Sequence, residues 1–115
     1  MRVTADLWVS ALTRRIFNDG GFAAVRRRGA REAGAIFILS RNRFGEIKLY
    51  QPAAQTSYDE AKPQERQFSL MLEGDEEAIE KKLERELRFD PDIWVVEIEH
   101  GSSDEDYIAV AVQEH

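Results

Sequence analysis

The chain of 115 residues contains no cysteine. This absence excludes disulfides, thiolate zinc sites, iron–sulfur ligation and a cysteine nucleophile, and it fits a reducing compartment. Long hydrophobic runs are missing as well. The longest run of apolar residues and glycine covers residues 33–39, far short of the ~20 residues that a membrane-spanning helix needs. The first residues also lack the apolar stretch of a secretory signal, so we expect a cytoplasmic protein with no membrane partner.

What the chain does contain is enough apolar sequence for a packed core. Hydrophobic residues make up 43% and aromatic residues 10%, which predicts one domain spanning residues 1–115. The charges are unevenly spread, with ten Lys or Arg and four Asp or Glu in residues 1–50, against six and eighteen in residues 51–115. Either the two parts neutralise each other in the fold, or a basic face binds an anionic partner.

Hydrophobic periodicity predicts two helices and six strands. Leu7, Leu12 and Ile16 lie on one stripe of a first helix that Asn18-Asp19-Gly20-Gly21 should end, and a second helix runs from residue 75 to about 88. Alternating apolar segments predict strands over residues 22–28, 34–40, 46–50, 66–72, 93–99 and 107–112. The expected fold is α+β, a mainly antiparallel sheet with two packed helices in the order αββββαββ, whose first three strands form a meander.

Several of these segments resemble a family of small alphaproteobacterial proteins known only as a domain of unknown function. The most specific segment is Arg88-Phe89-Asp90-Pro91-Asp92-Ile93-Trp94, and weaker ones are Val25-Arg26-Arg27-Arg28-Gly29 and Leu49-Tyr50-Gln51-Pro52-Ala53. The similarity spans nearly the whole chain. It implies a bacterial cytoplasmic protein and transfers no activity or catalytic residue.

Signatures of known chemistry are missing from the sequence. It has no phosphate-binding loop, no dinucleotide fingerprint, no nucleophile elbow and no zinc-binding histidine pair. His100 follows a strand near Glu97 and Glu99 and could be a general base, but a solvated turn histidine is the favoured interpretation. Asp104-Glu105-Asp106 is predicted to be an exposed acidic turn rather than a metal site. We therefore assign no catalytic residue, metal ligand or cofactor.

Arginines give the strongest remaining signal. Five arginines could contact nucleic-acid phosphates: Arg26, Arg28, Arg31, Arg41 and Arg43. Phe44 or Tyr50 could then stack on a base. In a meander they would form at most two small patches. The net charge of −6 argues against nucleic acid, and pairing of these arginines with Glu97, Glu99 and the acidic second helix is the favoured alternative.

A long irregular segment, residues 51–65, offers a second candidate site. Its Tyr58 and Asp59 belong to a polar group that could contact a peptide or a small ligand, although a solvated connection is also expected here. The sequence thus favours a non-enzymatic binding module that engages a protein through a sheet edge or through this loop. The alternatives are a nucleic-acid-associated domain and a small enzyme with a site near Tyr58, Asp59 and His100.

Overall fold

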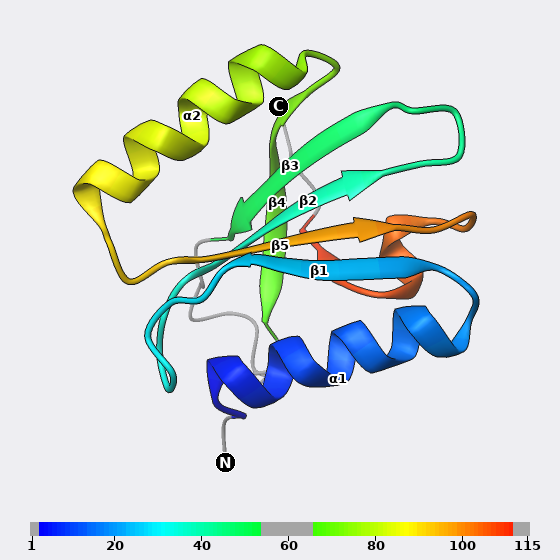
Figure 1. Cartoon of the computed structure of the whole chain (residues 1–115), viewed down its shortest axis with the longest axis horizontal. Helices are drawn as coiled ribbons and strands as arrows, with labels where there is room; N and C mark the ends of the chain where they lie inside the picture. Colours follow the sequence, from blue (N-terminus) through cyan, green and yellow to red (C-terminus); the bar gives the residue numbers. More distant parts are fainter. Residues whose placement is uncertain (1–2, 54–65, 112–115) are drawn as a thin grey trace.

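A computed structural model describes residues 3–53 and 66–111. The elements in chain order are α1 (Ala5–Asn18), β1 (Phe22–Arg27), β2 (Ile36–Arg41), β3 (Ile47–Pro52), β4 (Gln67–Glu73), α2 (Glu76–Phe89), β5 (Trp94–Glu99), the short 3-10 helix η1 (Asp104–Asp106) and β6 (Ala109–Val110). Figure 1 shows their arrangement. The α+β class and the order of helices and strands agree with the sequence-based expectation, with η1 as an addition.

All six strands belong to one sheet, in the spatial order β1-β5-β2-β3-β4-β6. The sheet is mixed, because β5 runs parallel to β2 and β6 runs parallel to β4, while the other three pairs are antiparallel. The expectation of a mainly antiparallel sheet is therefore wrong. The predicted meander of the first three strands is wrong as well, since β5 lies between β1 and β2.

The composition of β5 explains this insertion. Trp94 and Val96 point to one face of the sheet and Val95 to the other, and all three are buried. A strand that is apolar on both faces is stable only in the interior of a sheet. β1 ends in arginines and is exposed over much of its length, so it suits the edge.

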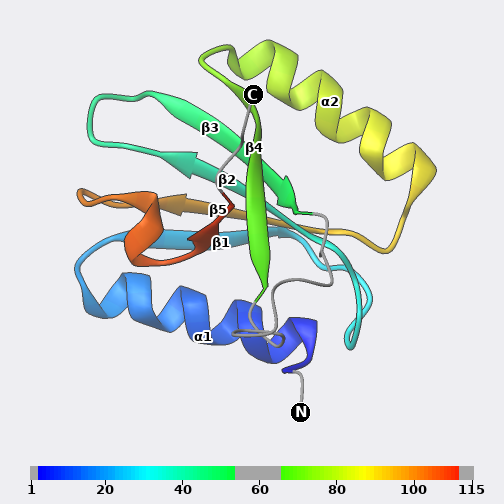
Figure 2. The same ribbon diagram turned by 180° about the vertical axis from the view of Figure 1, so that it is seen from behind.

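The two helices cover opposite faces of the sheet (Figures 1 and 2). α1 packs Val9 and Ile16 into a cluster with the even-numbered face of β2, which includes Ile38. α2 packs Ile79 against the odd-numbered face, which includes Leu39. β2 is thus buried on both sides, as its unbroken apolar run indicates.

A tight turn joins α1 to β1 and fixes where the edge strand starts. Gly20 has a φ of 88°, a left-handed conformation that favours glycine. Gly21 lies so close to β5 that a Cβ atom there would be 2.6 Å from the carbonyl oxygen of Glu99. Because of this close approach, β1 pairs with β5 from its first residue, Phe22.

Candidate interaction site

Two of the arginines predicted to be site residues form ion pairs that link the sheet to α2. Arg26 forms an ion pair with Glu80 at 2.9 Å, and Arg41 forms one with Glu76 at 2.7 Å. Hydrogen bonding to Glu80 and to Glu76 raises the pKa values of Arg26 and Arg41, respectively, against the opposing effect of burial. Both charges are thereby compensated within the fold.

Arg41 has further carboxylates nearby. Its Nε lies 3.6 Å from a carboxylate oxygen of Glu99 and 3.9 Å from one of Glu97. Both acidic residues belong to β5, which runs beside β2. The basic first part of the chain and the acidic second part therefore meet at this face of the sheet.

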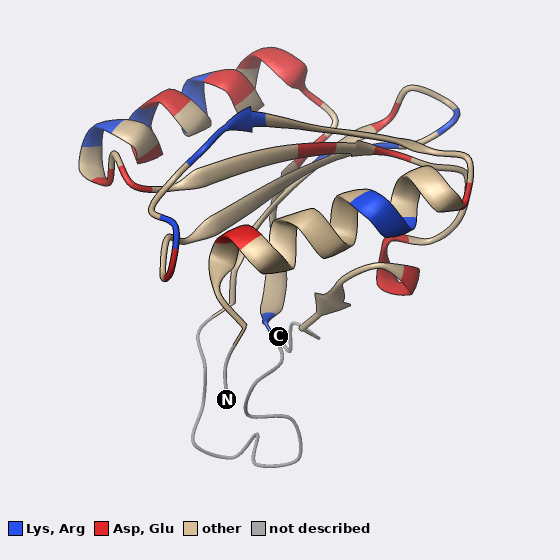
Figure 3. Cartoon of the chain, turned by 60° about the horizontal axis from the view of Figure 1, so that its bottom comes forward, with Lys and Arg blue, Asp and Glu red and all other residues tan. Residues whose placement is uncertain are grey.

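The other predicted arginines are dispersed. Arg31 pairs with Asp6 at 3.0 Å near the start of α1. Arg28 places its guanidinium 5.0 Å from the ring centre of Trp94, and Arg43 donates to the carbonyl of Gly101. The five arginines therefore do not form one surface. Figure 3 shows basic residues at the end of β1, and acidic and basic residues interleaved along α2.

His100 is buried, with only 4% of its side chain exposed, so the prediction of a solvated turn histidine is wrong. Its Nε2 lies 2.7 Å from Oδ1 of Asp104, and its Nδ1 accepts a hydrogen bond from the backbone N–H of Ser102. These roles define the Nε2–H tautomer. Both ring nitrogens are engaged, which leaves no lone pair to take a proton from a substrate.

Asp104 is the centre of a polar cluster rather than part of an exposed turn, and that prediction is corrected for this residue. Its carboxylate accepts hydrogen bonds from Ser40 Oγ and from the Tyr50 hydroxyl, each at 2.6 Å, and from His100. Only 11% of the Asp104 side chain is exposed. Burial alone would raise the pKa of Asp104, but the three hydrogen bonds outweigh it and lower that pKa. The cluster fastens η1 to β2 and β3.

Tyr50 belongs to the same polar cluster as a hydrogen-bond donor to Asp104. Burial, followed by the hydrogen bond to Asp104, raises the pKa of the Tyr50 phenol far above its usual range. The phenol therefore stays protonated and serves as a donor. Tyr58 and Asp59, the other members of the enzyme hypothesis, lie outside the described residues.

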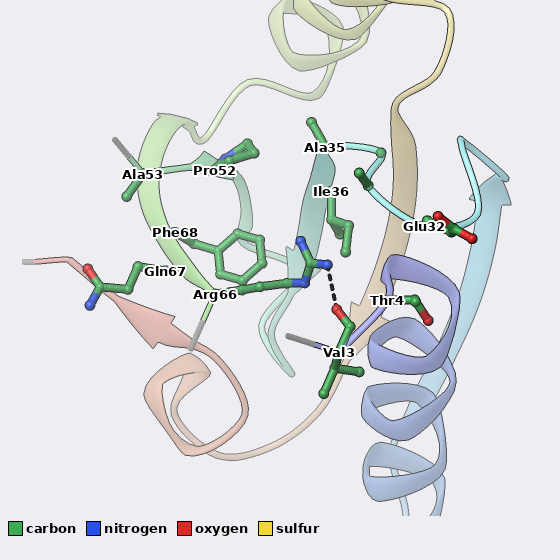
Figure 4. A pocket seen from close by; sticks show the side chains of 12 residues that line it. Val3, Thr4, Glu32, Ala35, Ile36, Pro52, Ala53, Arg66, Gln67 and Phe68 are labelled. Atoms are coloured by element: carbon green, nitrogen blue, oxygen red, sulfur yellow. Dashed lines mark hydrogen bonds between the residues drawn. The ribbon is translucent and has the colours of Figure 1, made fainter. Parts of the chain in front are cut away.

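A cavity of about 410 Å3 lies beside the end of β3 and the start of β4 (Figure 4). Phe68 and Ile36 supply buried apolar surface, while Glu32 and Arg66 stand at the walls. Arg66 donates to the carbonyl of Val3 at 2.9 Å. The described residues that line the cavity are mainly apolar.

A second, more polar cavity of about 720 Å3 lies at the end of the sheet near the α1–β1 turn. Arg41, Arg43 and His100 line it together. Their polar atoms already bind Glu76, a backbone carbonyl and Asp104. This cavity therefore brings three predicted site residues together, but their polar atoms already form hydrogen bonds within the protein.

The outer edge of β1 is the most distinctive exposed feature. β1 ends the strand order and so has a neighbour on one side only. Phe17, Phe22 and Val25 lie beside this edge with exposed fractions of 51%, 47% and 37%. Phe17 and Phe22 contact each other edge to face, with ring centres 6.0 Å apart. We call Phe22–Val25 together with Phe17 the β1 edge site.

A groove of about 330 Å3 between α1 and β1 adjoins this site. It is lined by Asp6, Val9, Ser10, Thr13, Arg14, Val25, Arg28 and Trp94. Sequence reasoning named Arg28 but missed Phe17, Phe22 and Arg14. A signal was present, because Phe17 falls off the apolar stripe of its helix and Phe22 opens a strand that ends in three arginines.

Two structural requirements concern the described residues, that of a metal site and that of a membrane-spanning helix. Within residues 3–53 and 66–111, no group of three His, Asp or Glu side chains could hold a metal ion. In the same part of the chain, no helix has the length and apolar character needed to cross a membrane.

These features define an α+β domain with a mixed six-stranded sheet, a helix on each face and an open edge strand. The sequence profile of the protein family of unknown function DUF1491 matches residues 3–106, and the chain belongs to that family. The resemblance noted from the sequence is thereby confirmed.

Solved structures from two alphaproteobacteria share the fold. The solution structure of protein Atu0922 from A. tumefaciens is 45% identical, with a TM-score of 0.82, and the match covers 99% of this chain and 98% of that one. The crystal structure of a DUF1491 family protein from Caulobacter crescentus is 33% identical, with a TM-score of 0.79 and coverage of 95% and 99%. A comparison with curated proteins finds no match.

Proposed function

We propose that this protein is a non-enzymatic binding module that takes up an extended segment of a partner protein at the β1 edge site. The observation that carries the proposal is the position of β1 at the end of the sheet, flanked by the exposed Phe17, Phe22 and Val25. An edge strand presents unpaired N–H and C=O groups that a partner strand can bind, while neighbouring side chains select its sequence.

The two halves of β1 differ in how open they are. Proteins protect sheet edges with charges and bulges. The second half of β1 has both, because the register with β5 shifts between Val25 and Arg27, and Arg26 and Arg27 carry charge. The first half, Phe22–Val25, has neither of these protections. At the opposite end of the sheet, β6 is only two residues long and offers little edge.

The competing functions have weaker support. An enzyme would need a free acid or base in a cavity, whereas the nitrogens of His100 are both engaged. The nucleic-acid hypothesis used five arginines, and three of them, Arg26, Arg31 and Arg41, are paired with carboxylates. The β1 edge site could bind a partner without breaking any of these hydrogen bonds or ion pairs.

Site-specific photo-crosslinking tests the proposal. The photoreactive analogue p-benzoylphenylalanine replaces Phe22 in one sample and Phe44 in the other, and each is irradiated in an alphaproteobacterial extract. Phe44 is the matched control, since it is 80% exposed but lies in the β2–β3 turn. We expect a discrete protein adduct at position 22 that is absent at position 44.

A second substitution distinguishes strand pairing from nonspecific hydrophobic association. Val25→Lys places a charge beside the edge, which should prevent pairing without emptying the core, because Val25 is 37% exposed. We expect the adduct at position 22 to disappear in this background. Equal adducts at positions 22 and 44, or an adduct indifferent to Val25→Lys, would contradict the proposal.

A further inference from the structure

Three arginines near the β1 edge site carry charges that the fold does not compensate. Among the described residues, no carboxylate lies within ion-pair distance of Arg14, Arg27 or Arg28, and all three are exposed. Arg27 donates only to the carbonyl of Pro91, and Arg28 stacks on Trp94. Uncompensated cations at one end of the edge attract an anionic partner.

At the opposite end of the edge, the acidic residues have partners within the fold. Phe22 pairs in the sheet with Glu99, which lies 3.6 Å from Arg41, and Asp19, in the turn just before β1, accepts a hydrogen bond from Tyr107. The uncompensated charge along this edge is therefore the positive charge at the Arg28 end, which attracts a carboxylate. This charge fixes both the chemistry of the partner and where along β1 its acidic residue must lie.

The groove between α1 and β1 has the right lining for an acidic side chain. Val25 provides exposed apolar surface for the methylene groups of such a side chain, while Arg14 and Arg28 provide guanidinium donors, that of Arg28 lying over the Trp94 ring. Its volume, about 330 Å3, lies at the small end of ligand pockets, which span roughly 300–1,000 Å3.

One carboxylate of the fold also lines this groove, but it is already bound. Asp6 accepts hydrogen bonds from the Thr4 hydroxyl, the Leu7 amide and Arg31. The bond from Thr4 is the main influence that lowers the pKa of Asp6, and the contacts with Arg31 and Leu7 act in the same direction. Asp6 therefore stays ionised with its own partners and does not compensate Arg14 or Arg28.

From these charges and this lining, and resting on the proposed function, we propose that the partner segment is an acidic extended peptide. It pairs with β1, places a glutamate beside Val25 in the groove, and places an apolar residue three positions away beside Phe22. The spacing follows from the strand, because Val25 lies on the α1 face and Phe22 on the α2 face, so residues an odd number apart contact them.

Peptide titrations followed by NMR test this inference. The probe is an acetylated nine-residue peptide that alternates threonine and valine around a central glutamate, which puts valine three positions from the acid in either direction. The matched probe carries glutamine in place of the glutamate. We expect the acidic peptide to shift the amide resonances of β1 and the side-chain Nε–H resonances of Arg14 and Arg28, with affinity about tenfold above that of the glutamine peptide.

Variants identify the arginines responsible. Arg14→Gln and Arg28→Gln should each weaken binding of the acidic peptide and leave binding of the glutamine peptide unchanged. Arg14 is exposed with no ion pair to lose, so this variant keeps the test valid if Arg28→Gln disturbs Trp94. Arg43→Gln is the control, because Arg43 is also exposed but binds a carbonyl at the far end of the sheet.

The outcomes separate the acidic inference from the edge-binding proposal. Equal binding of both peptides at β1 would overturn the acidic specificity and leave edge binding intact. No change in β1 resonances with either peptide at millimolar concentration would overturn both. Shifts of β1 resonances with protein concentration alone would assign the edge to a second copy, and shifts of Arg14 and Arg28 by single-stranded DNA in place of the peptide would assign the groove to nucleic acid. Either result would overturn the inference.

Discussion

Replacing Asp104 by alanine removes one acceptor that serves three donors from separate parts of the chain. Ser40, Tyr50 and His100 would each lose a hydrogen bond at 2.6–2.7 Å, and Tyr50 and His100 are buried. A hydrogen bond to a charged group contributes about 1.5–3 kcal/mol, and burial of the carboxylate offsets part of the total. Breaking a buried charged network by removing one member costs about 3–5 kcal/mol. We expect Asp104→Ala to lower the free energy of unfolding by about 3 kcal/mol.

Urea denaturation followed by tryptophan fluorescence measures this loss, since Trp94 is buried in the core. The matched control is Glu105→Ala, an exposed neighbour whose removal should cost less than about 0.5 kcal/mol. Asp104→Asn keeps an acceptor oxygen but loses the charge, so its cost should fall between the two. A loss below about 1 kcal/mol for Asp104→Ala at pH 7 would refute the reasoning.

The pH dependence gives an independent check. The pKa of Asp104 is lower in the folded protein than the unfolded value of about 3.9, so its contribution to stability is full above that value. The contribution is lost as pH falls through the lower, folded pKa. The difference in unfolding free energy between the parent protein and Asp104→Asn should thus shrink as the pH falls below about 4. A difference that grows between about pH 4 and pH 2 would contradict the assignment.

Three further substitutions test the packing described above. Gly29→Ala should abolish folding or destabilise it severely, seen as loss of the circular dichroism melt, because a Cβ atom would lie 2.2 Å from the Asp92 carbonyl oxygen. Ile79→Ala should cost about 3 kcal/mol in urea denaturation, since Ile79 is fully buried on the inner face of α2, whereas Leu7→Ala on the exposed side of α1 should be nearly neutral. Asp75→Ala should cost about 1 kcal/mol through loss of the cap on α2, and Asp75→Asn should restore most of it. An unchanged midpoint in any of the destabilising variants would contradict the contact concerned.

The helices and the strand segments were predictable because each shows its own apolar periodicity. Leu12 and Ile16 of the predicted stripe and the run through Ile36 and Phe37 correspond to buried faces in the fold, whereas Leu7, predicted on the same stripe, is 62% exposed. Strand order was not predictable in this way. It depends on which long-range pairs form, and nothing local to β1 or β2 reveals that β5 lies between them.

The polar cluster illustrates a similar limit. Asp104 is one of three consecutive acidic residues, and the local pattern indicates a solvated turn. Its burial follows from Ser40 and Tyr50, which lie in the neighbouring strands β2 and β3 and both donate hydrogen bonds to its carboxylate. The sequence contained a partial signal, because a hydroxyl within an apolar face needs a hydrogen-bond partner. Identifying that partner requires the tertiary fold.

The central position of β5 has a consequence for how the chain acquires its structure. Among the described strands, residues 94–99 supply the one neighbour of β1 and one of the two neighbours of β2. During synthesis, β1 is made early but has nothing to pair with until roughly seventy further residues have followed, so the sheet closes late and across a long loop. A ribosome-bound fragment ending before Trp94 would leave β1 and one edge of β2 without their partner strand, and unpaired strand edges of this kind favour aggregation.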